Sequence, residues 1–487
     1  MLQIKDTGRV TEIKQTICKV SGLSTCLNGQ QIYFPDEAPG MVVGFAEEEA
    51  SVLLLKGNRG LRAGAPVYGI REIFDIPVGD SFIGRIVNPL GEPLDGKGPI
   101  KTTDRRSIFC DVPSVLERRP VIDPLETGVK ILDLMIPIGR GQRQLVLGDR
   151  MTGKTTILTD TILNQKGRGV VCIYCCIGKS ESALNKVLQL LVEHDAMKYT
   201  IVVAATASMP PGQQYLAPYS ACSIGEHFMY KGNHVLVGFD DFTRHAWIYR
   251  QISLLLERSP GREAYPGDIF YLHSQMIERA ANLLSEQGGG SMTFLPIVET
   301  LQGDVTGYIP TNLISMTDGQ IYLSTTLFSE GFKPAIDLGL SISRIGSKVQ
   351  WPAIKKLSGM LRLDYLQYRE LEKLARVRSG GAEDMEAKLK RGRILTEIIK
   401  QDKNRPVPLE EQVVLCYFFR QGKMDSLSID QARIFRNHLG RWVKEARPEI
   451  LEKLAREKTL TPEIEKELDG LVQTATEQKW FERTEKV

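Results

Sequence analysis

An eight-residue loop motif restricts the fold of this chain more than any other feature. Residues 148–155 read GDRMTGKT and match the pattern GxxxxGK[ST]. The apolar run QLVLG (144–148) precedes the motif, and TTILTDTILNQ, a helix-like segment, follows it. Glycines let backbone N–H groups curl around phosphate oxygens, and the N-terminus of the following helix adds a favourable field. The motif therefore predicts a phosphate-binding loop (P-loop) between a strand and a helix.

The side chains of this loop predict a bound Mg-nucleotide, either ATP or ADP. Lys154 would neutralise the β- and γ-phosphates, and Thr155 would offer its hydroxyl to magnesium. A Gly-rich loop without a ligand is the alternative, which the flanking strand and helix patterns disfavour. The other residues expected around the phosphates are Gly148, Asp149, Arg150, Met151, Thr152, Gly153 and Thr156.

A second magnesium ligand is expected at the end of another apolar strand. Asp240 follows the run VLVGF (235–239), and a carboxylate at that strand end would hold the metal through its water shell. Asp241 comes next and could take the same role. The alternative for both aspartates is capping of the following helix, and it is favoured for Asp241.

Three regions of different pattern follow one another along the chain. Residues 1–73 contain short β-like runs separated by turn-forming residues, which predicts a small barrel or sandwich. Residues 74–355 alternate apolar runs with helical stretches, the pattern of a parallel sheet. Residues 356–487 are charged and helical, with a helix start expected at Thr461 and Pro462. We expect three domains with these boundaries.

Charge and composition exclude several classes of protein. The 62 basic and 59 acidic residues nearly balance, so there is no general basic bias for nucleic-acid binding. No apolar run approaches the roughly 18–20 residues of a transmembrane helix, and MLQIKDTGRV lacks the apolar core of a secretory signal. The eight cysteines show no disulfide framework. We therefore expect a cytosolic chain that reaches membranes only through partners.

Several separate segments resemble the alpha subunit of F-type rotary ATPases (ATP synthase). The P-loop and the preceding IPIGRGQRQLVLGD carry part of the resemblance. The rest lies in residues 249–281, in PTNLISMTDGQIYL (310–323) and in PAIDLGLSISRIGS (334–347). The last segment contains the alpha/beta signature P-A-I-D-x-x-x-S-x-S. The resemblance runs from the first barrel strand near Gly8 into the C-terminal helices and weakens after about residue 405.

The resemblance implies an N-terminal β-barrel crown, a central RecA-like α/β P-loop domain and a C-terminal α-helical domain. It implies a six-membered ring of alternating alpha and beta subunits around a rotating gamma subunit. A peripheral stalk and a membrane ion channel would be joined through other subunits. The complex would make ATP from ADP and phosphate using a proton or sodium gradient, or run in reverse, at the cytoplasmic side of the bacterial plasma membrane. In this family alpha holds a nucleotide that is not turned over.

Position 179 bears on that last point. In the beta subunits the water-activating glutamate follows a Gly after the apolar strand next to the P-loop helix, and here the segment is Ile177-Gly178-Lys179. Alpha subunits usually have Gln there, so Lys179 departs even from them. A lysine is an ammonium at neutral pH and cannot accept a proton. We therefore expect Lys179 to lie at a nucleotide site that does not hydrolyse its ligand.

The catalytic contribution implied by the resemblance comes from Arg344. It matches the family's arginine finger, whose guanidinium would reach the γ-phosphate held by the adjacent beta subunit. Such a finger supplied in trans is worth roughly 10³–10⁵ in rate. Ser341 matches a family position also needed for activity, and we expect it to place the arginine.

Other positions depart from the family pattern. Met151 replaces the P-loop glutamine, Lys333 stands where alpha usually has Arg, and Gln401-Asp402-Lys403 stands for Gln-x-Gln. The resemblance places Lys333, Gln401 and Lys403 around the adenine. The barrel pattern begins almost immediately, without the additional helical segment of typical alpha subunits. This start suggests the alternate (N-type) bacterial branch.

Two other functions are weighed against this one. A self-sufficient hexameric secretion-type ATPase would need a glutamate at position 179. An RNA translocase of the termination-factor type would need a basic, aromatic face on the barrel, and residues 1–73 have few aromatics and an ordinary number of acids. Both alternatives are disfavoured by the sequence.

Overall fold

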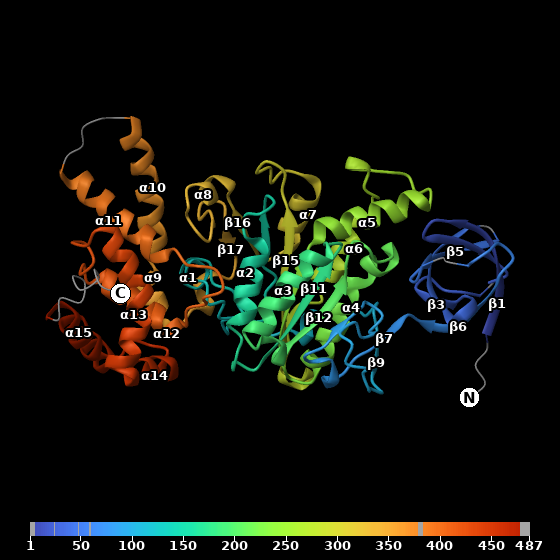
Figure 1. The fold of residues 1–487 in the computed structure, drawn as a ribbon, viewed down its shortest axis with the longest axis horizontal. Coiled ribbons are helices and arrows are strands. Elements are labelled where there is room, and N and C mark those ends of the chain that lie inside the picture. Colours follow the sequence, from blue (N-terminus) through green and yellow to red (C-terminus); the bar gives the residue numbers. More distant parts are fainter. Residues whose placement is uncertain (1–4, 24, 47, 58–59, 378–382, 478–487) are drawn as a thin grey trace. The chain divides into compact units, whose positions relative to one another are not determined.

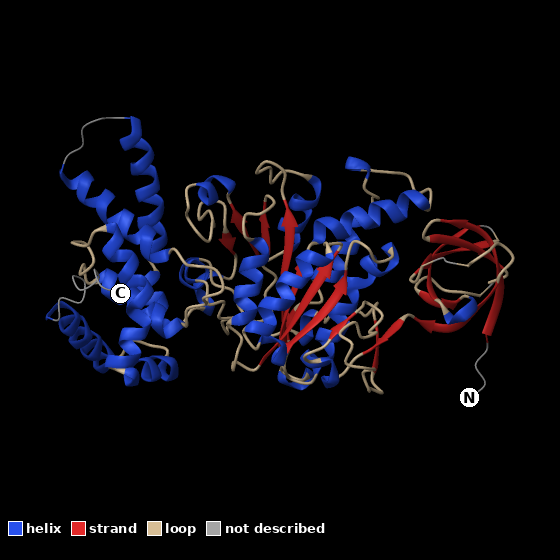
Figure 2. Cartoon of the chain, in the orientation of Figure 1, coloured by secondary structure: helices blue, strands red, loops and turns tan. Residues whose placement is uncertain are grey.

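The computed structural model describes residues 5–23, 25–46, 48–57, 60–377 and 383–477. The chain forms two compact units that are interleaved in sequence. The first unit contains Met1–Pro120, Arg140–Leu147 and Lys166–Asp318, and the second contains Val121–Gly139, Gly148–Gln165 and Gly319–Val487. Figures 1 and 2 show the elements of each unit.

A closed six-stranded barrel begins the first unit, drawn in blue in Figure 1. Its antiparallel strands follow the order β1-β2-β5-β4-β3-β6. Each strand turns an aliphatic residue that is at most 2 % exposed into the barrel core: Val10, Val20, Ile32, Val42, Val52 and Val67. The strands are β1 (Lys5–Lys14), β2 (Ile17–Ser21), β3 (Gln30–Tyr33), β4 (Pro39–Ala46), β5 (Glu49–Leu54) and β6 (Pro66–Ile73).

The rest of the first unit is built on a sheet of buried strands in the order β10-β15-β13-β11-β12-β8. The pairs from β15 to β8 are parallel, as the continuous apolar runs predict. The helix α4 (Pro211–Tyr230) packs closely on this sheet, since a Cβ at Gly225 would lie 2.7 Å from Met292 Sδ. The strands are β8 (Ile86–Val87), β10 (Leu145–Gly148), β11 (Val170–Ile177), β12 (Thr200–Ala205), β13 (His234–Asp240) and β15 (Ser291–Glu299).

Shorter elements complete the first unit. The strands β7 and β9 form a separate antiparallel pair, and β14 pairs with β15. Their bounds, with those of the remaining helices, are β7 (Asp75–Pro77), β9 (Arg105–Ser107), β14 (Ala281–Asn282), α3 (Glu181–Glu193), α5 (Phe242–Leu255), α6 (Ile269–Ile277) and α7 (Tyr308–Met316).

The second unit contains the P-loop helix α2 (Lys154–Leu163), the short helix α1 (Lys130–Met135) and the antiparallel pair β16 (Gly319–Leu323) and β17 (Ile342–Ser343). Its last part is helical, as predicted, and is orange to red in Figure 1. The predicted start at Thr461 is confirmed, because its Oγ1 accepts a hydrogen bond from Ile464 N at 3.3 Å. The other helices are α8 (Thr325–Ser329), α9 (Pro352–Ser358), α10 (Leu361–Val377), α11 (Glu383–Ile399), α12 (Leu409–Arg420), α13 (Ile429–Ala446), α14 (Pro448–Glu457) and α15 (Pro462–Glu477).

The predicted fold class is confirmed: a barrel, a central α/β domain with a mostly parallel sheet and a helical C-terminal region are all present. The proposed domain boundaries at 73/74 and 355/356 stay predictions. Within the described residues, no helix combines the length and the apolar character needed to cross a membrane.

Candidate nucleotide-binding site

The P-loop has the backbone conformation that its glycines predict. Gly148 and Gly153 have φ values of +155° and +103°, which favour glycine. A side chain at Gly148 has no space, because its Cβ would lie 2.6 Å from the carbonyl oxygen of Leu323. Thr152 Oγ1 donates a hydrogen bond of 2.8 Å to Asp149 O and closes the turn ahead of α2. The loop is therefore a backbone cradle at a helix N-terminus, the arrangement that binds phosphate.

Lys154 lies inside this cradle. It is 7 % exposed, and its Nζ donates to the carbonyl oxygens of Gly148 at 2.7 Å and Asp149 at 2.5 Å. A buried ammonium beside a backbone cradle suits an anionic ligand, so a phosphate is a favourable additional partner. Thr155 follows on the first turn of α2 and is partly buried.

A cavity of about 530 Å³ opens beside the P-loop in the same unit. This volume lies in the range of about 300–1,000 Å³ that is usual for small-molecule sites. Seven of the predicted residues line it: Met151, Thr152, Gly153, Thr156, Lys333, Gln401 and Lys403. The cradle, the buried ammonium and the cavity together fit a nucleotide.

The 401–405 loop is fixed by hydrogen bonds to the helix α2 and to residues 128 and 130. Asn404 N donates to Asp160 Oδ1 at 2.9 Å, and Asp160 also lines the cavity. The amide of Gln401 is fully engaged, because its Nε2 donates to Gly128 O and Arg405 O and its Oε1 accepts from Lys130 N. Gln401 therefore holds the backbone segments that form one wall of the cavity.

The sequence reasoning missed an aromatic wall. Phe328, in α8, lines the cavity, and Lys333 Nζ lies 4.8 Å from the centre of its ring. An aromatic face beside a phosphate cradle suits the stacking of a nucleobase. The only available signal was the position of Phe328 five residues before Lys333, which is not specific enough to predict a contact.

Lys179 and Asp240 form an ion pair in the first unit. Lys179 Nζ contacts Asp240 Oδ1, and Tyr174 donates its hydroxyl proton to Asp240 Oδ2 at 3.0 Å. The Asp240 side chain is 0 % exposed and that of Lys179 is 18 % exposed. The predicted magnesium ligand therefore already has an ammonium and a phenol as partners. In this arrangement the carboxylate does not fit a divalent cation, which would first have to displace Lys179.

Asp241, the competing candidate, caps the helix α5. Its Oδ1 accepts a hydrogen bond from Arg244 N at 2.9 Å, which is the geometry of an N-cap. Burial, with a smaller contribution from the neighbouring Asp240, raises the pKa of Asp241 to about 6. No group of three or more His, Cys, Asp or Glu side chains that could hold a metal ion occurs within the described ranges.

Arg344 lies directly after β17, on a turn that is anchored on both sides. Ser341 is 0 % exposed, and its Oγ accepts from Tyr322 N at 2.9 Å, while Arg362 donates to Ser341 O at 2.8 Å. Ser343 Oγ donates to Pro137 O at 3.0 Å. The Arg344 side chain is exposed and makes no hydrogen bond or ion pair with the described part of the chain.

Comparison with known proteins identifies the family. Family models match residues 3–70 (ATP synthase alpha/beta family, beta-barrel domain), 128–343 (the nucleotide-binding domain of that family) and 350–475 (ATP synthase alpha/beta chain, C terminal domain). Two curated relatives, each described as ATP synthase subunit alpha, come from the Eklund 17B and Alaska E43 strains of Clostridium botulinum. Each is 46% identical over 469 residues, which cover 96% of this chain and 93% of the relative. The chain belongs to the alpha subunits of the ATP synthase alpha/beta family.

This membership confirms the resemblance read from the sequence. An alpha subunit is part of a hetero-oligomeric, ion-transporting rotary ATPase, binds adenine nucleotide and is a peripheral component of a membrane-bound complex. The secretion-type alternative has no support among the relatives.

Proposed function

We propose that this alpha subunit holds ATP or ADP without hydrolysing it and supplies Arg344 to the catalytic site of a neighbouring beta subunit. The observation that carries this proposal is the buried Lys179–Asp240 ion pair. By the resemblance, position 179 is where a hydrolytic member of the family has its base, and here it carries an amine in contact with a carboxylate. An ammonium in contact with a carboxylate is a poor proton acceptor, which supports a site that does not hydrolyse its nucleotide.

Retention of the nucleotide is supported by the second unit alone. Lys154 and the N–H groups at the start of α2 would bind the phosphates, and the aromatic Phe328 would stack on the base. The loop around Gln401 would hold the base side of the cavity. Each of these groups is already fixed by hydrogen bonds or by packing, so little order remains to be gained on binding.

Magnesium would enter this site with the nucleotide. The Thr155 hydroxyl is the predicted protein ligand, and magnesium would add positive charge beside the phosphates. Asp240 can take a cation only after Lys179 leaves its carboxylate. We therefore propose a smaller contribution of Asp240 to metal binding than the P-loop pattern alone predicts.

The exposed Arg344 is better suited to a partner than to its own chain. A guanidinium presents a planar fork of donors that matches phosphate oxygens. Here that fork has no intramolecular partner among the described residues, although the turn that carries it is anchored at Ser341 and Ser343. A fixed backbone with an unengaged cation is what transition-state stabilisation in trans requires.

The proposed assembly follows from the family. Three copies of this chain would alternate with three beta subunits around a gamma subunit, with a peripheral stalk and a membrane sector carried by other subunits. The complex would lie at the cytoplasmic side of a bacterial plasma membrane and couple ATP synthesis or hydrolysis to proton or sodium transport. No nucleic acid takes part.

Reconstitution with a beta-type partner tests the proposal. The purified chain should bind ADP and show no steady-state ATP hydrolysis, and activity should appear only in the mixture. The mixture with Arg344→Ala is the matched control, because it keeps the P-loop and removes only the exposed guanidinium. Robust hydrolysis by the chain alone would refute the proposal.

A further inference from the structure

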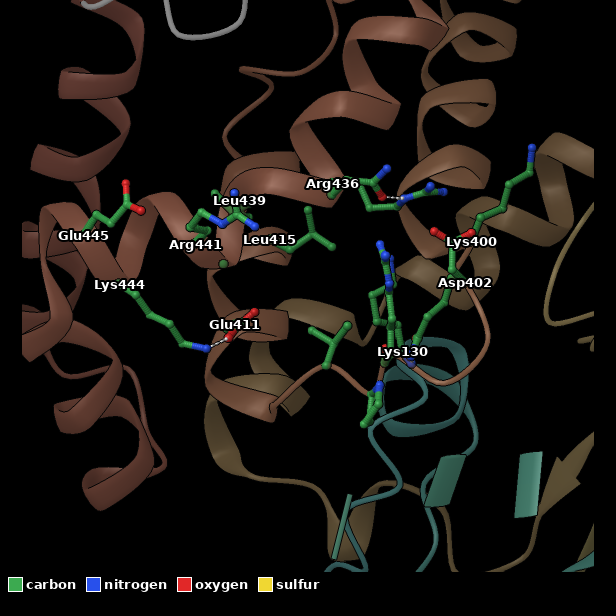
Figure 3. Close-up of a pocket in the computed structure, with 16 residues that line it drawn as sticks. Lys130, Lys400, Asp402, Glu411, Leu415, Arg436, Leu439, Arg441, Lys444 and Glu445 are labelled. Atoms are coloured by element: carbon green, nitrogen blue, oxygen red, sulfur yellow. Dashed lines mark hydrogen bonds and ion pairs between the residues drawn. The ribbon is translucent and has the colours of Figure 1, made fainter. Parts of the chain in front are cut away.

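A second cavity, of about 490 Å³, lies in the same unit as the P-loop and is lined by α1, α12, α13 and the 400–407 segment. Figure 3 shows Lys444 and Glu411 on one side of this basic cavity and Lys130, Lys400 and Asp402 on the other. Its lining has three acidic residues, Asp402, Glu411 and Glu445. Against these stand six cations: Lys130, Lys400, Arg405, Arg436, Arg441 and Lys444.

Half of these cations already have an ion-pair partner. Lys400 and Arg436 contact Glu397 at 2.9 and 3.1 Å, and Lys444 contacts Glu411 at 2.6 Å. The other three, Lys130, Arg405 and Arg441, make no ion pair with any described residue. The acids of the lining without an ion pair are Asp402 and Glu445, so a positive charge remains.

Lys130 is the most unusual of the three. It is 2 % exposed, and its Nζ donates to the carbonyl oxygen of Ile398. An ammonium has three donors, so two remain for another partner. Burial lowers the pKa of Lys130 well below its usual value; Arg436 lowers it further, whereas Cys416, Glu397 and Asp402 oppose this shift. An anion in the cavity would favour the charged form.

The basic cavity shares a wall with the nucleotide cavity. Gln401 and Asp402 line both, and Val129 and Lys130, adjacent in sequence, line one each. The Gln401 amide ties this wall together, because it accepts from Lys130 N at 2.9 Å and donates to Gly128 O at 2.8 Å. A ligand that moves Lys130 or Asp402 therefore changes the shape of the nucleotide cavity.

We propose that the basic cavity is a second anion site, which takes a small phosphate-bearing anion and is coupled to the nucleotide site through Gln401. Guanidinium groups are the usual partners of phosphate, and two unengaged ones line this cavity. The coupling acts in both directions, since a ligand that changes the affinity of another is affected by it equally.

Titration calorimetry on the full chain tests the site. The chain is first saturated with ADP, which fills the P-loop, and is then titrated with inorganic pyrophosphate or with further ADP. Saturable pyrophosphate binding is expected, and a second ADP event would show that nucleotides are the source of the phosphate. Arg405→Gln and Arg441→Gln should each weaken this binding about tenfold, equivalent to one charge-assisted hydrogen bond. Absence of binding by both anions would overturn the proposal.

Arg456→Gln is the control for charge, because Arg456 is an exposed cation outside the cavity. Equal weakening by Arg456→Gln and Arg441→Gln would mean nonspecific attraction and would overturn the site. The first ADP event, measured on the same variants, reports the P-loop separately. Loss of the first ADP event would contradict the proposed function, whereas loss of pyrophosphate binding with the first ADP event intact would overturn only the second site.

Two further readouts address Lys130 and the coupling. Pyrophosphate binding should also be weaker in Lys130→Gln, which removes the buried ammonium that donates to Ile398 O. Pyrophosphate should also change the affinity for ADP by about fivefold or more. Arg405→Gln and Arg441→Gln should reduce that change in ADP affinity. If pyrophosphate changes the ADP affinity equally in the parent and in both variants, the anion binds outside the basic cavity.

Discussion

The P-loop and the turn that carries Arg344 use their cations in opposite ways, although both belong to the second unit. Lys154 is buried and donates to two backbone carbonyls of its own loop. Arg344 is exposed and has no partner among the described residues, on a turn fixed through Ser341. In the proposed function, the first arrangement retains a ligand within the chain, and the second supplies a side chain to another chain. Binding and catalysis would thus be separated in this subunit.

Removal of the Arg344 side chain should give the largest loss of activity and leave nucleotide binding at the P-loop unchanged. Arg344→Ala should lower kcat of the assembled complex by about 10³-fold or more, the usual worth of an arginine finger. The ADP affinity of the isolated chain should not change. Steady-state hydrolysis and ADP titration are the measurements, and size-exclusion chromatography checks assembly.

Arg344→Lys is the control for charge. Lysine keeps the positive charge but lacks the donor fork, so its activity should lie between those of the parent and Arg344→Ala. Full turnover by Arg344→Ala would place this arginine outside the catalytic site.

Much of this comparison could be predicted from the sequence, because its parts are local. The P-loop pattern specifies backbone conformations at Gly148 and Gly153, and continuous apolar runs such as 170–177 specify buried strands. The helix start at Thr461 is likewise set by adjacent residues.

Contacts between residues far apart in sequence could not be predicted. Position 179 was identifiable, but the contact of its ammonium with Asp240 depends on the parallel pairing of β11 and β13. The engagement of the Gln401 amide by the backbone of residues 128 and 130, and the contact of Phe328 with Lys333, likewise depend on tertiary packing. Sequence patterns specify the elements, whereas packing decides which side chains remain available.

Substitution of Lys154 tests whether the P-loop holds the nucleotide. Lys154→Gln should lower the ADP affinity of the isolated chain about 10- to 100-fold, because a charged hydrogen bond contributes roughly 1.5–3 kcal/mol. Calorimetric titration measures the change. Lys423→Gln, at an exposed lysine of the same unit, is the matched control and should leave the affinity unaltered. An equal loss in both variants would mean that general charge holds the nucleotide.

Removal of the Lys179 charge asks whether the first unit contributes a metal ligand. In Lys179→Gln the Asp240 carboxylate loses its ammonium partner, so it becomes available to a divalent cation. Magnesium should then raise the ADP affinity about threefold to tenfold more in the variant than in the parent, or about 1 kcal/mol. ADP titrations with magnesium and with EDTA give this difference. Lys179→Arg, which keeps the charge, should behave as the parent, and an unaltered magnesium dependence in Lys179→Gln would mean that Asp240 takes no part.

Substitution of Ser341 tests whether this residue positions Arg344 or takes part in the chemistry. It should give the smallest change in kcat. Its Oγ accepts from the buried Tyr322 N, so Ser341→Ala leaves that donor unsatisfied at a cost of about 1–3 kcal/mol. The free energy of unfolding should fall by that amount, and kcat of the complex should fall about twofold to fivefold, because the turn that holds Arg344 is less well fixed. Denaturant titration and steady-state hydrolysis measure the two effects, with Ser347→Ala, at an exposed serine of the following 3₁₀ helix Gly346–Val349, as control. A loss of kcat as large as that of Arg344→Ala at unchanged stability would instead assign Ser341 a direct chemical role.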